Sequence, residues 1–457
     1  MFRPKFYQKF IYLLGLSVLI LSSPLSLLAQ TTQPEPTQPS LTRPTVLSRP
    51  VNPPTGIAAP SMDASVVPAV GMTGILVETL DGQTVMEQLG NIGFNPASAV
   101  KLATALAALR TFGPEHRFTT AVWTNGTIDK ATGTINGDLI ISGRDPSFHY
   151  EHAVMLAREL NRMGIRTVTG DLIVAPRFTM NFSLSAQRSG DALYDTLDAT
   201  RRPAAAARAW TDERIALGDA ASLRSMPSVA VMGAVYVDSV PKGARPVLTH
   251  NSSKLVDVLK VLLCYSNNFM AERIGDTLGG PEGVRRVAIR DARVSPAEIS
   301  LATTSGLGVN RVTPRAMMKI FRALRDELAK ANLSPSDIMP VAGVDPGTLH
   351  KRYTSYPSRG SVIAKTGTLI RTDGGVSALV GQMKTARGET LLFVIFNQRG
   401  SFLRFRESQD VLVTQLQNQR GGPAAFSYRP LTLSMRLADT EQSAVTALSD
   451  EYEPGTR

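Results

Sequence analysis

Several residue types that would point to particular kinds of site are scarce in this sequence of 457 residues. It contains one cysteine, Cys264, so no disulfide bond can form within the chain. Because Cys264 lies in an apolar stretch, we expect it to be a core residue rather than a nucleophile. The five histidines are scattered. His149 and His152 could share a helix face, but no third ligand accompanies them, so we predict no metal and no cofactor. No basic block is interleaved with aromatic residues, which disfavours nucleic acid as a partner.

The composition is otherwise that of a folded protein with a surplus of basic residues. Hydrophobic residues make up 43% of the chain, and 49 Lys and Arg outnumber 38 Asp and Glu, for a net charge of +11. This balance favours anionic partners, such as acidic lipid headgroups or an acidic polymer of the cell wall. The alternative is charge that is dispersed over the surface without a partner.

The first 29 residues have the features of a secretory signal peptide. Three basic residues precede an apolar stretch at residues 10–21, and a cleavage site follows near Ala29. We therefore predict an exported, periplasmic protein with no membrane span after cleavage. The alternative, an uncleaved membrane anchor, is disfavoured because the apolar stretch is short for a span. A lipid anchor is excluded because no cysteine directly follows the stretch.

Two further segments are expected to lie outside the folded region. Residues 30–64 are rich in proline among Thr, Gln and Ser, a composition typical of an extended linker. The end of the chain, residues 426–457, becomes polar and acidic with few large apolar residues, which predicts a disordered tail. Folded structure is therefore expected between about residues 65 and 425.

The residues around Ser98 predict a helix that begins with a nucleophile. Asn95 suits the N-cap, Pro96 suits the first helical position, and the alanine-rich run that follows ends at Gly113. Lys101 lies three residues after Ser98 on the same helix face, where its amine can meet the hydroxyl. A serine hydroxyl needs an adjacent base, and a lysine can be that base if burial lowers its pKa. Because Ser-x-x-Lys is a short pattern that also occurs by chance, it needs support from elsewhere in the chain.

Two later stretches supply that support. Ser266-Asn267-Asn268 separates two helical runs and predicts a turn that exposes its side chains, although a plain turn has the same composition. Lys365-Thr366-Gly367 lies on an alternating strand at residues 361–369, and the alternative is a solvated strand end. A glycine inside a strand often marks the close approach of a ligand or another backbone, which favours a role for Gly367.

The rest of the folded region reads as a mixture of helices and strands, with residues 181–228 left unassigned. The phrase Gly-Asp-Leu-Ile occurs twice, at residues 137–140 and 170–173, and suggests two similar β units. The remaining predictions are a hairpin at residues 75–80 and 83–89, strands at 118–124, 137–141, 170–174, 376–383 and 390–396, and helices at 153–163, 254–265 and 406–417.

The order Ser98-x-x-Lys101, Ser266-x-Asn268, Lys365-Thr366-Gly367 is that of penicillin-binding proteins and serine β-lactamases. Further phrases, over about residues 66–420, resemble the D-Ala-D-Ala carboxypeptidase/endopeptidase family, the class C low-molecular-mass penicillin-binding proteins. They are Pro96-Ala97-Ser98, Gly113-Pro114, Arg117-Phe118-Thr119-Thr120, Gly137-Asp138-Leu139, Asp145-Pro146, Gly170-Asp171-Leu172, His250 with Ser252, Ser266 to Glu272, Ser305-Gly306-Leu307, Arg311 to Arg315, Val341 to Asp345 and Lys365 to Leu369.

The sequence departs from the family pattern at two places. The interval between Ser98 and Ser266 is shorter than expected for a member with two full inserted subdomains, so one of them is expected to be reduced or missing. Thr303-Thr304 precedes Ser305, where the family usually has Asp-Gly. That difference puts the packing of the local loop in doubt but leaves the chemistry intact.

The resemblance implies an α+β fold of the β-lactamase/transpeptidase type, with an antiparallel sheet flanked by helices and a helical lobe. The D,D-peptidase domain would comprise residues 65–115 and 248–425. A β-rich domain at residues 116–247 would be inserted between the first two motifs.

The resemblance also implies an activity, the hydrolysis of the D-Ala-D-Ala bond of peptidoglycan stem peptides through an acyl-enzyme, with β-lactams as covalent inhibitors. In this interpretation Ser98 is the nucleophile, Lys101 its base, Ser266 a proton relay and Asn268 a partner of Lys101. The substrate-binding residues would be Lys365, as a fixed charge for the substrate carboxylate, with Thr366, Gly367 and Thr368. The N–H groups of Ser98 and Thr368 would form the oxyanion hole. The alternatives are a β-lactamase and a non-catalytic protein that senses penicillin or binds the wall.

Overall fold

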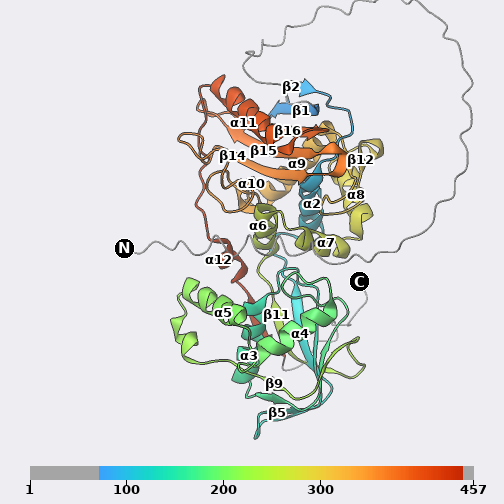
Figure 1. Cartoon of the computed structure of the whole chain (residues 1–457), viewed down its shortest axis with the longest axis vertical. Coiled ribbons are helices and arrows are strands. Elements are labelled where there is room, and N and C mark those ends of the chain that lie inside the picture. The colour runs from blue at the N-terminus through green and yellow to red at the C-terminus, as the bar shows by residue number, and fades with distance from the viewer. Residues whose placement is uncertain (1–70, 446–457) are drawn as a thin grey trace, which may run out of the picture. The chain divides into compact units, whose positions relative to one another are not determined.

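The computed structural model describes residues 71–445. The predicted signal peptide, the predicted linker and the last twelve residues of the predicted tail lie outside the described residues. The main sheet has five antiparallel strands in the order β14-β15-β16-β1-β2 (Figure 1). These strands are β1 (Met72–Thr79), β2 (Thr84–Gln88), β14 (Val362–Leu369), β15 (Val376–Lys384) and β16 (Thr390–Gln398).

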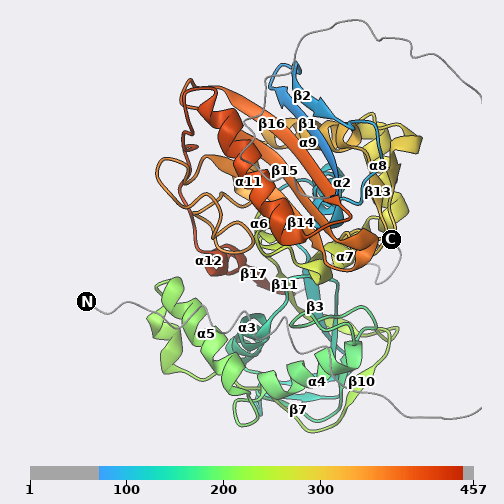
Figure 2. The same cartoon turned by 45° about the horizontal axis from the view of Figure 1, so that its top comes forward.

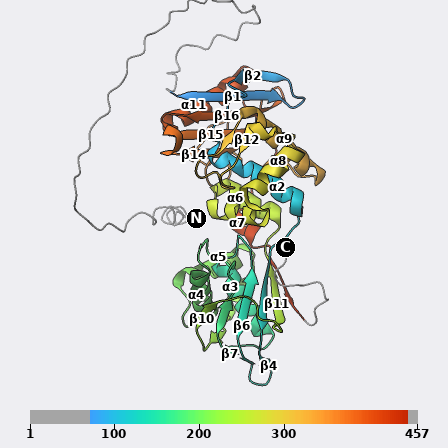
Figure 3. The same ribbon diagram turned by 90° about the vertical axis from the view of Figure 1, so that its right-hand side faces the viewer.

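Both faces of this sheet are covered by helices, because its central strands are apolar on both sides. In β16, Phe393 and Ile395 pack in the same cluster as Val413 of α11 (Phe402–Asn418). Val394 and Phe396 point the other way, into the large core that the remaining helices form. Figures 2 and 3 show α11 alone on one face of the sheet and α9 and α2 on the other. The remaining elements of this region are α2 (Lys101–Phe112), α6 (Leu255–Tyr265), α7 (Asn268–Thr277), α8 (Gly280–Asp291), α9 (Pro314–Lys330), α10 (Pro335–Ile338), β12 (Ile299–Ser300) and β13 (Arg311–Val312).

The region between the first two motifs has its own sheets and its own core. One sheet has the order β10-β8-β6-β3-β11-β17, and a smaller one has the order β4-β5-β7-β9. Buried side chains such as Val122, Leu156 and Leu193 form a hydrophobic cluster separate from the large core. The elements are β3 (Thr119–Thr124), β4 (Thr127–Asp129), β5 (Thr134–Asn136), β6 (Leu139–Gly143), α3 (Tyr150–Arg162), β7 (Thr167–Val168), β8 (Leu172–Val174), α4 (Ala186–Leu197), α5 (Ala204–Ala216), β9 (Ala230–Val231), β10 (Val235–Val237) and β11 (Arg245–Asn251).

The Gly-Asp-Leu-Ile phrases form two adjacent parallel strands. In β6 and β8, Leu139 lies beside Leu172 and Ile140 beside Ile173. A carboxylate Oδ1 of Asp138 accepts a hydrogen bond from the N–H of Asp171, 2.8 Å away. A third unit, β10, continues the pattern, because Oδ1 of Asp171 accepts from the N–H of Ala234 at 2.7 Å. The sequence predicted two such units. The third escaped notice because alanine replaces its aspartate.

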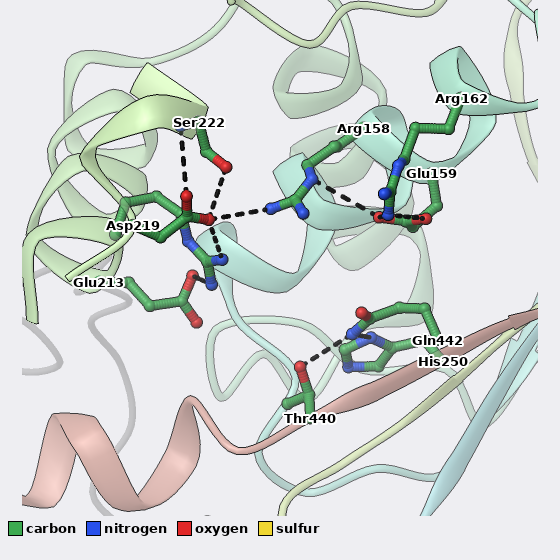
Figure 4. Close-up of polar contacts among 10 residues, drawn as sticks. Arg158, Glu159, Arg162, Glu213, Asp219, Ser222, His250, Thr440 and Gln442 are labelled. Carbon is green, nitrogen blue, oxygen red and sulfur yellow. Dashed lines mark hydrogen bonds and ion pairs between the residues drawn. The ribbon is translucent and has the colours of Figure 1, made fainter. Parts of the chain in front are cut away.

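The unassigned stretch at residues 181–228 contains α4 and α5, so the inserted region is less β-rich than predicted. Apolar side chains such as Leu193 and Trp210 pack in its hydrophobic clusters, and polar contacts add to them: Asp219 lies 3.5 Å from Arg158 of α3 and accepts from Ser222 (Figure 4). The predicted helix at residues 153–163 starts earlier, because His149 and His152 form a capping box at the start of α3.

The tail predicted to be disordered is structured over its first part. Residues 433–437 form α12 (Leu433–Leu437), and β17 (Glu441–Ala444) pairs with β11 as an edge strand. The side chain of Gln442 contacts His250 and Thr440 (Figure 4). Composition missed this segment because its order comes from backbone pairing, ion pairs and only a few apolar side chains, such as Leu433, that pack in the large core. The strand β11 also crosses the predicted domain boundary at residue 248 and belongs to the inserted sheet.

The α+β fold class is confirmed, with helices and mixed sheets as expected. The predicted hairpin is β1 and β2, and the three predicted strands at residues 361–369, 376–383 and 390–396 are β14, β15 and β16. Within residues 71–445, no helix has the length and apolar character needed to cross a membrane.

Candidate active site

Ser98 lies at the junction of the sheet and the helical core, just before α2. The predicted α-helix is wrong in its first turn: residues Ala97–Val100 form a 3₁₀ turn, and the α-helix begins at Lys101. Ala97 has a φ of 45°, in the left-handed region, so the chain bends sharply beside the serine. The side chain of Asn95 accepts from the N–H of Ala97 at 3.1 Å, which stabilises this bend locally. The Ser98 side chain is only partly buried and remains accessible to a ligand.

Lys101 has the position and environment expected of a base. Its Nζ lies 2.9 Å from Ser98 Oγ, 2.7 Å from Asn268 Oδ1 and 2.6 Å from the carbonyl oxygen of Ser305. Burial lowers the pKa of Lys101 to about 7, against a smaller opposing effect of Glu272. A neutral amine donates two hydrogen bonds and accepts one. Because Asn268 and Ser305 can only accept here, the lone pair is left for the hydroxyl of Ser98.

The second motif is a turn between two helices, as predicted. Ser266 ends α6 in the left-handed conformation with a φ of 58°. Asn267 caps α7, because its side-chain oxygen accepts from the N–H of Met270. The side chains before and after Asn267 point toward the two lysines. Asn268 Oδ1 accepts from Lys101, and Ser266 Oγ lies 2.8 Å from Nζ of Lys365.

The third motif lies on β14, an edge strand of the main sheet. A Cβ at position 367 would lie 2.6 Å from the carbonyl oxygen of Pro96, which is too close, so this position favours glycine. The close approach expected at Gly367 is therefore confirmed, and the approaching backbone is that of the turn before Ser98. Gly306 makes a similar contact from another side, where a Cβ would lie 2.0 Å from the carbonyl oxygen of Ala97. The Ser98 turn is thus held between two glycines.

Lys365 is wholly buried, and its environment differs from that expected of a fixed charge. Its Nζ donates to Ser266 Oγ at 2.8 Å and to the carbonyl oxygen of Thr366 at 2.6 Å. Burial, and next the charge of Lys101, holds the pKa of Lys365 well below its usual value. No carboxylate pairs with Lys365 among the ion pairs of the described residues. Its one hydrogen bond to another side chain within residues 71–445 is that to Ser266 of the second motif.

A comparison of the sequence with models of known families identifies its family. The model of the D-Ala-D-Ala carboxypeptidase 3 (S13) family matches residues 63–207 and 196–419 of the sequence. The chain belongs to this family. It is therefore a serine-type D-Ala-D-Ala carboxypeptidase, as the three motifs predicted.

Individual relatives of this S13 chain are distant but cover most of it. Carboxypeptidase Rv3627c of Mycobacterium tuberculosis is 26% identical over 79% of this chain and 83% of its own length. The D-alanyl-D-alanine carboxypeptidase of Actinomadura sp. strain R39 is 27% identical over 77% of this chain and 82% of its own. Among solved structures, the penicillin G-acylated predatory endopeptidase Bd3459 of Bdellovibrio bacteriovorus, in complex with the immunity protein Bd3460, has a TM-score of 0.66. It is 23% identical, over 81% of this chain and all of that one, so it shares the fold.

Two residues of this S13 site were given no role from sequence. Glu272, on α7, accepts from the N–H of Ser305 at 3.0 Å and from the hydroxyl of Thr304 at 2.8 Å. It therefore holds the loop whose carbonyl oxygen contacts Lys101. Thr304 is one of the two residues that depart from the family pattern, and its hydroxyl is part of what holds this loop.

The other is Arg406 on α11, whose Nη2 donates to the hydroxyl of Thr368 at 2.9 Å. No ion pair of Arg406 is present among the described residues, because nearby Asp410 pairs with Arg352 at 2.6 Å. Its position in the final predicted helix gave no sign of this contact, which depends on how α11 packs across the sheet.

Proposed function

We propose that Ser98 is the nucleophile with which this carboxypeptidase attacks the carbonyl carbon between two terminal D-alanines of a peptidoglycan stem peptide. The observation that carries this assignment is the buried Lys101 amine 2.9 Å from Ser98 Oγ, with a pKa of about 7. As the Oγ–C bond forms, the hydroxyl proton passes to Nζ of Lys101. Asn268 and the Ser305 carbonyl hold that amine in place in both of its protonation states.

Bond cleavage needs a proton on the leaving amine. Ser266, donating from its hydroxyl while it accepts from Lys365, is the proposed relay to that nitrogen. D-Alanine then leaves, and the acyl group remains as an ester on Ser98. The proton that Lys101 took from Ser98 passes to Ser266, where it replaces the one given to the leaving amine, and Lys101 is neutral again. Water attacks the ester, and Lys101 accepts its proton and returns it to the Ser98 oxygen as the ester bond breaks, which restores the free enzyme. The N–H groups of Ser98 and Thr368 are the proposed donors to the oxyanion, and loss of one such donor costs about 3–4 kcal/mol in other enzymes.

The terminal carboxylate of the substrate is assigned to Thr368 and Arg406. A guanidinium is permanently charged and binds a carboxylate through two parallel hydrogen bonds. Arg406 uses one of its N–H groups to donate to the hydroxyl of Thr368. The edge of β14 gives an extended peptide a strand to lie along, and Thr366 and Gly367 are on this strand directly after Lys365.

The same site supports two further expectations. A β-lactam presents a carbonyl and a carboxylate like those of the peptide, so Ser98 should be acylated by penicillin, as the Bdellovibrio endopeptidase is. Cross-linked peptides that contain a D-alanyl bond are candidate substrates too, which would add endopeptidase activity. Export to the periplasm is proposed from the signal-peptide pattern of residues 1–29. A non-catalytic role is disfavoured because every predicted catalytic side chain has its partner.

Labelling with a fluorescent penicillin tests the proposal. Wild-type protein should form a covalent adduct that survives denaturation, and Ser98→Ala should form none while its thermal melt is unchanged. Ser305→Ala is a matched control, because its contact with Lys101 uses the backbone oxygen. Full labelling of Ser98→Ala would exclude Ser98 as the nucleophile. A β-lactamase would differ by releasing the adduct within the time of the assay.

A further inference from the structure

Arg406 and Asp410 lie four residues apart on α11, the helix that covers one face of the main sheet (Figure 2). Side chains at this spacing are neighbours on a helix surface, where arginine and aspartate readily form an ion pair. No such pair joins Arg406 to Asp410 among the described residues. The guanidinium of Arg406 instead contacts Thr368 of β14 and lies over the ring of Phe402, 5.3 Å from its centroid. The helix thus carries a competitor for the substrate carboxylate that is not engaged with this arginine.

Arg352 holds the carboxylate of Asp410. Its Nε donates to both carboxylate oxygens, at 2.9 and 3.2 Å, and its Nη2 donates to Oδ1 at 2.6 Å. Nη2 also lies 3.3 Å from Oε1 of Gln409, the residue before Asp410. Two N–H groups directed at one carboxylate fix its orientation as well as its position. Arg352 therefore occupies the group that would otherwise bind Arg406.

The turn that carries Arg352 is anchored on both sides of this residue. Leu349 and Tyr353 are buried in the hydrophobic cluster that includes Val413 of α11. The N–H of Arg352 donates to the carbonyl oxygen of Leu349 at 3.1 Å, and its guanidinium lies 5.7 Å from the centroid of the Tyr353 ring. The Arg352 side chain is only 11% exposed. Its contact with α11 is thus part of the packed structure, unlike an ion pair between two exposed side chains.

The charges around Arg406 leave it able to bind a further anion. Nη2 of Arg352 lies 3.5 Å from the carbonyl oxygen of Arg406, so the two arginines are neighbours. Burial, and next the charge of Arg352, lower the pKa of Arg406, and the charge of Asp410 opposes them. Two guanidinium groups therefore share the carboxylate of Asp410, an arrangement that favours a second carboxylate beside Arg406. If Asp410 turned toward Arg406, it would take the position of that second carboxylate.

We propose that Arg352 determines the preference of the enzyme for peptides with a free terminal carboxylate, because it keeps Asp410 from pairing with Arg406. The inference rests on the proposed function, in which Arg406 binds that carboxylate, and adds a residue that controls this recognition. Arg352 is a positioning residue in this scheme, since it acts through Asp410 and does not contact the substrate. Without Arg352, Asp410 pairs with Arg406 along α11, and the substrate carboxylate must displace it.

The test measures kcat/KM of the whole protein for two peptides that end in D-Ala-D-Ala, one with a free terminal carboxylate and one amidated. Arg352→Gln should lower kcat/KM for the free peptide roughly fivefold, mainly through KM, because an ion pair at the helix surface must first be broken. For the amidated peptide, kcat/KM should stay within about twofold of wild type. The double variant Arg352→Gln, Asp410→Asn should recover kcat/KM for the free peptide to within about twofold of wild type, because a neutral amide is a weak competitor for a guanidinium. Lys351→Gln, which alters an exposed basic residue of the same turn, is the control and should change neither value.

A loss that is equal on both peptides, or that persists in the double variant, would overturn the proposal and give Arg352 a purely structural role. No loss in Arg352→Gln would overturn it as well. Thermal melts show which variants fold. If Arg352→Gln does not fold, Asp410→Asn alone decides, because removal of the competitor should leave the preference for the free peptide equal to or above that of wild type. A lower preference in Asp410→Asn would overturn the proposal.

Arg406→Gln, measured with the same two peptides, separates this inference from the proposed function. A selective loss in Arg406→Gln without one in Arg352→Gln removes only the role of Arg352. The absence of a selective loss in both variants removes the assignment of the terminal carboxylate to Arg406, and the inference falls with it.

Discussion

The two active-site lysines are both buried, but their contacts give them different tasks. Lys101 contacts Ser98, the proposed nucleophile, and its pKa of about 7 leaves a large neutral fraction at physiological pH. Lys365 touches Ser266 instead, and burial beside Lys101 lowers its pKa as well. Two neighbouring ammonium groups without a carboxylate partner would repel each other strongly. Proton exchange within this cluster is therefore better supported than a permanent charge at Lys365.

The pH dependence of acylation should follow Lys101. The base is active when neutral, so its function is present above the pKa and is lost as the pH falls through it. We expect the rate of penicillin acylation to rise between about pH 6 and 8 with a midpoint near 7, and then to level off. Stopped-time labelling from pH 5.5 to 9 measures this, with thermal melts at each pH to exclude unfolding. A rate that is flat from pH 6 to 8 would remove Lys101 from the role of base.

Arg406 should decide recognition of the terminal carboxylate. Arg406→Gln should lower kcat/KM for a peptide ending in free D-Ala-D-Ala by about 2 kcal/mol, roughly thirtyfold, because a hydrogen bond to a charged group is lost. The C-terminally amidated peptide should lose less than about threefold. Arg404→Gln, an exposed neighbour on α11, is the control. If Lys365→Ala shows the selective loss and Arg406→Gln does not, the carboxylate belongs to Lys365 after all.

At the scale of elements, a buried ion pair joins the second and third motifs. Nζ of Lys260, on α6, lies 2.7 Å from Oδ2 of Asp345, and both side chains are fully buried. The same amine donates to the carbonyl oxygens of Ser336 and Met339. The segment that leads into β14 is therefore fixed to the helix that ends at Ser266. Relative placement of Ser266 and Lys365 depends on this link.

Breaking the pair from one side should be costly. Lys260→Met leaves the Asp345 carboxylate buried without its cation. We expect this change to lower the free energy of unfolding by about 3–5 kcal/mol, as is typical when one partner of a buried ion pair is removed. Lys330→Met, which removes a surface pair with Glu327, should cost less than about 1 kcal/mol. Urea unfolding of both variants provides the comparison. A loss below about 1 kcal/mol for Lys260→Met would show that the interior tolerates the lone carboxylate.

The sequence predicted those elements and contacts that depend on residues close together in the chain. Alternation and turn residues located β1, β2 and β14 to β16, and the spacing of Ser98 and Lys101 predicted their contact. The contact between Arg406 and Thr368 could not be predicted, because it joins residues whose proximity depends on helix packing across a sheet. The helix α5 was missed because its alanine-rich sequence gives no clear apolar period, and α4 was missed because small and polar residues occupy much of its buried face beside Leu193 and Leu197.

On the scale of the whole molecule, the end of the described chain connects the peptidase region to the inserted one. Tyr428 donates to Asp345 at 2.8 Å, and Arg436 of α12 lies 2.6 Å from Asp257 of α6. Farther along, Arg117 pairs with Asp439 and Glu441, and β17 adds a strand to the inserted sheet. A segment that looked disordered in composition thus links both regions, including the helix that ends at the second motif.

This role predicts that single residues of α12 affect stability according to burial. Leu433 is 6% exposed and packs in the large core, so Leu433→Ala should lower the free energy of unfolding by about 2–3 kcal/mol. Met435, on the same helix, is 39% exposed, and Met435→Ala should stay within about 0.5 kcal/mol of wild type. Ending the chain at residue 425 should cost at least as much as Leu433→Ala, because β17 and the Tyr428 contact are lost too. Thermal and urea unfolding of the three variants decide the matter. If the tail were disordered, all three variants would be as stable as the wild type. If it links the two regions, Leu433→Ala and the truncated chain will be less stable than Met435→Ala.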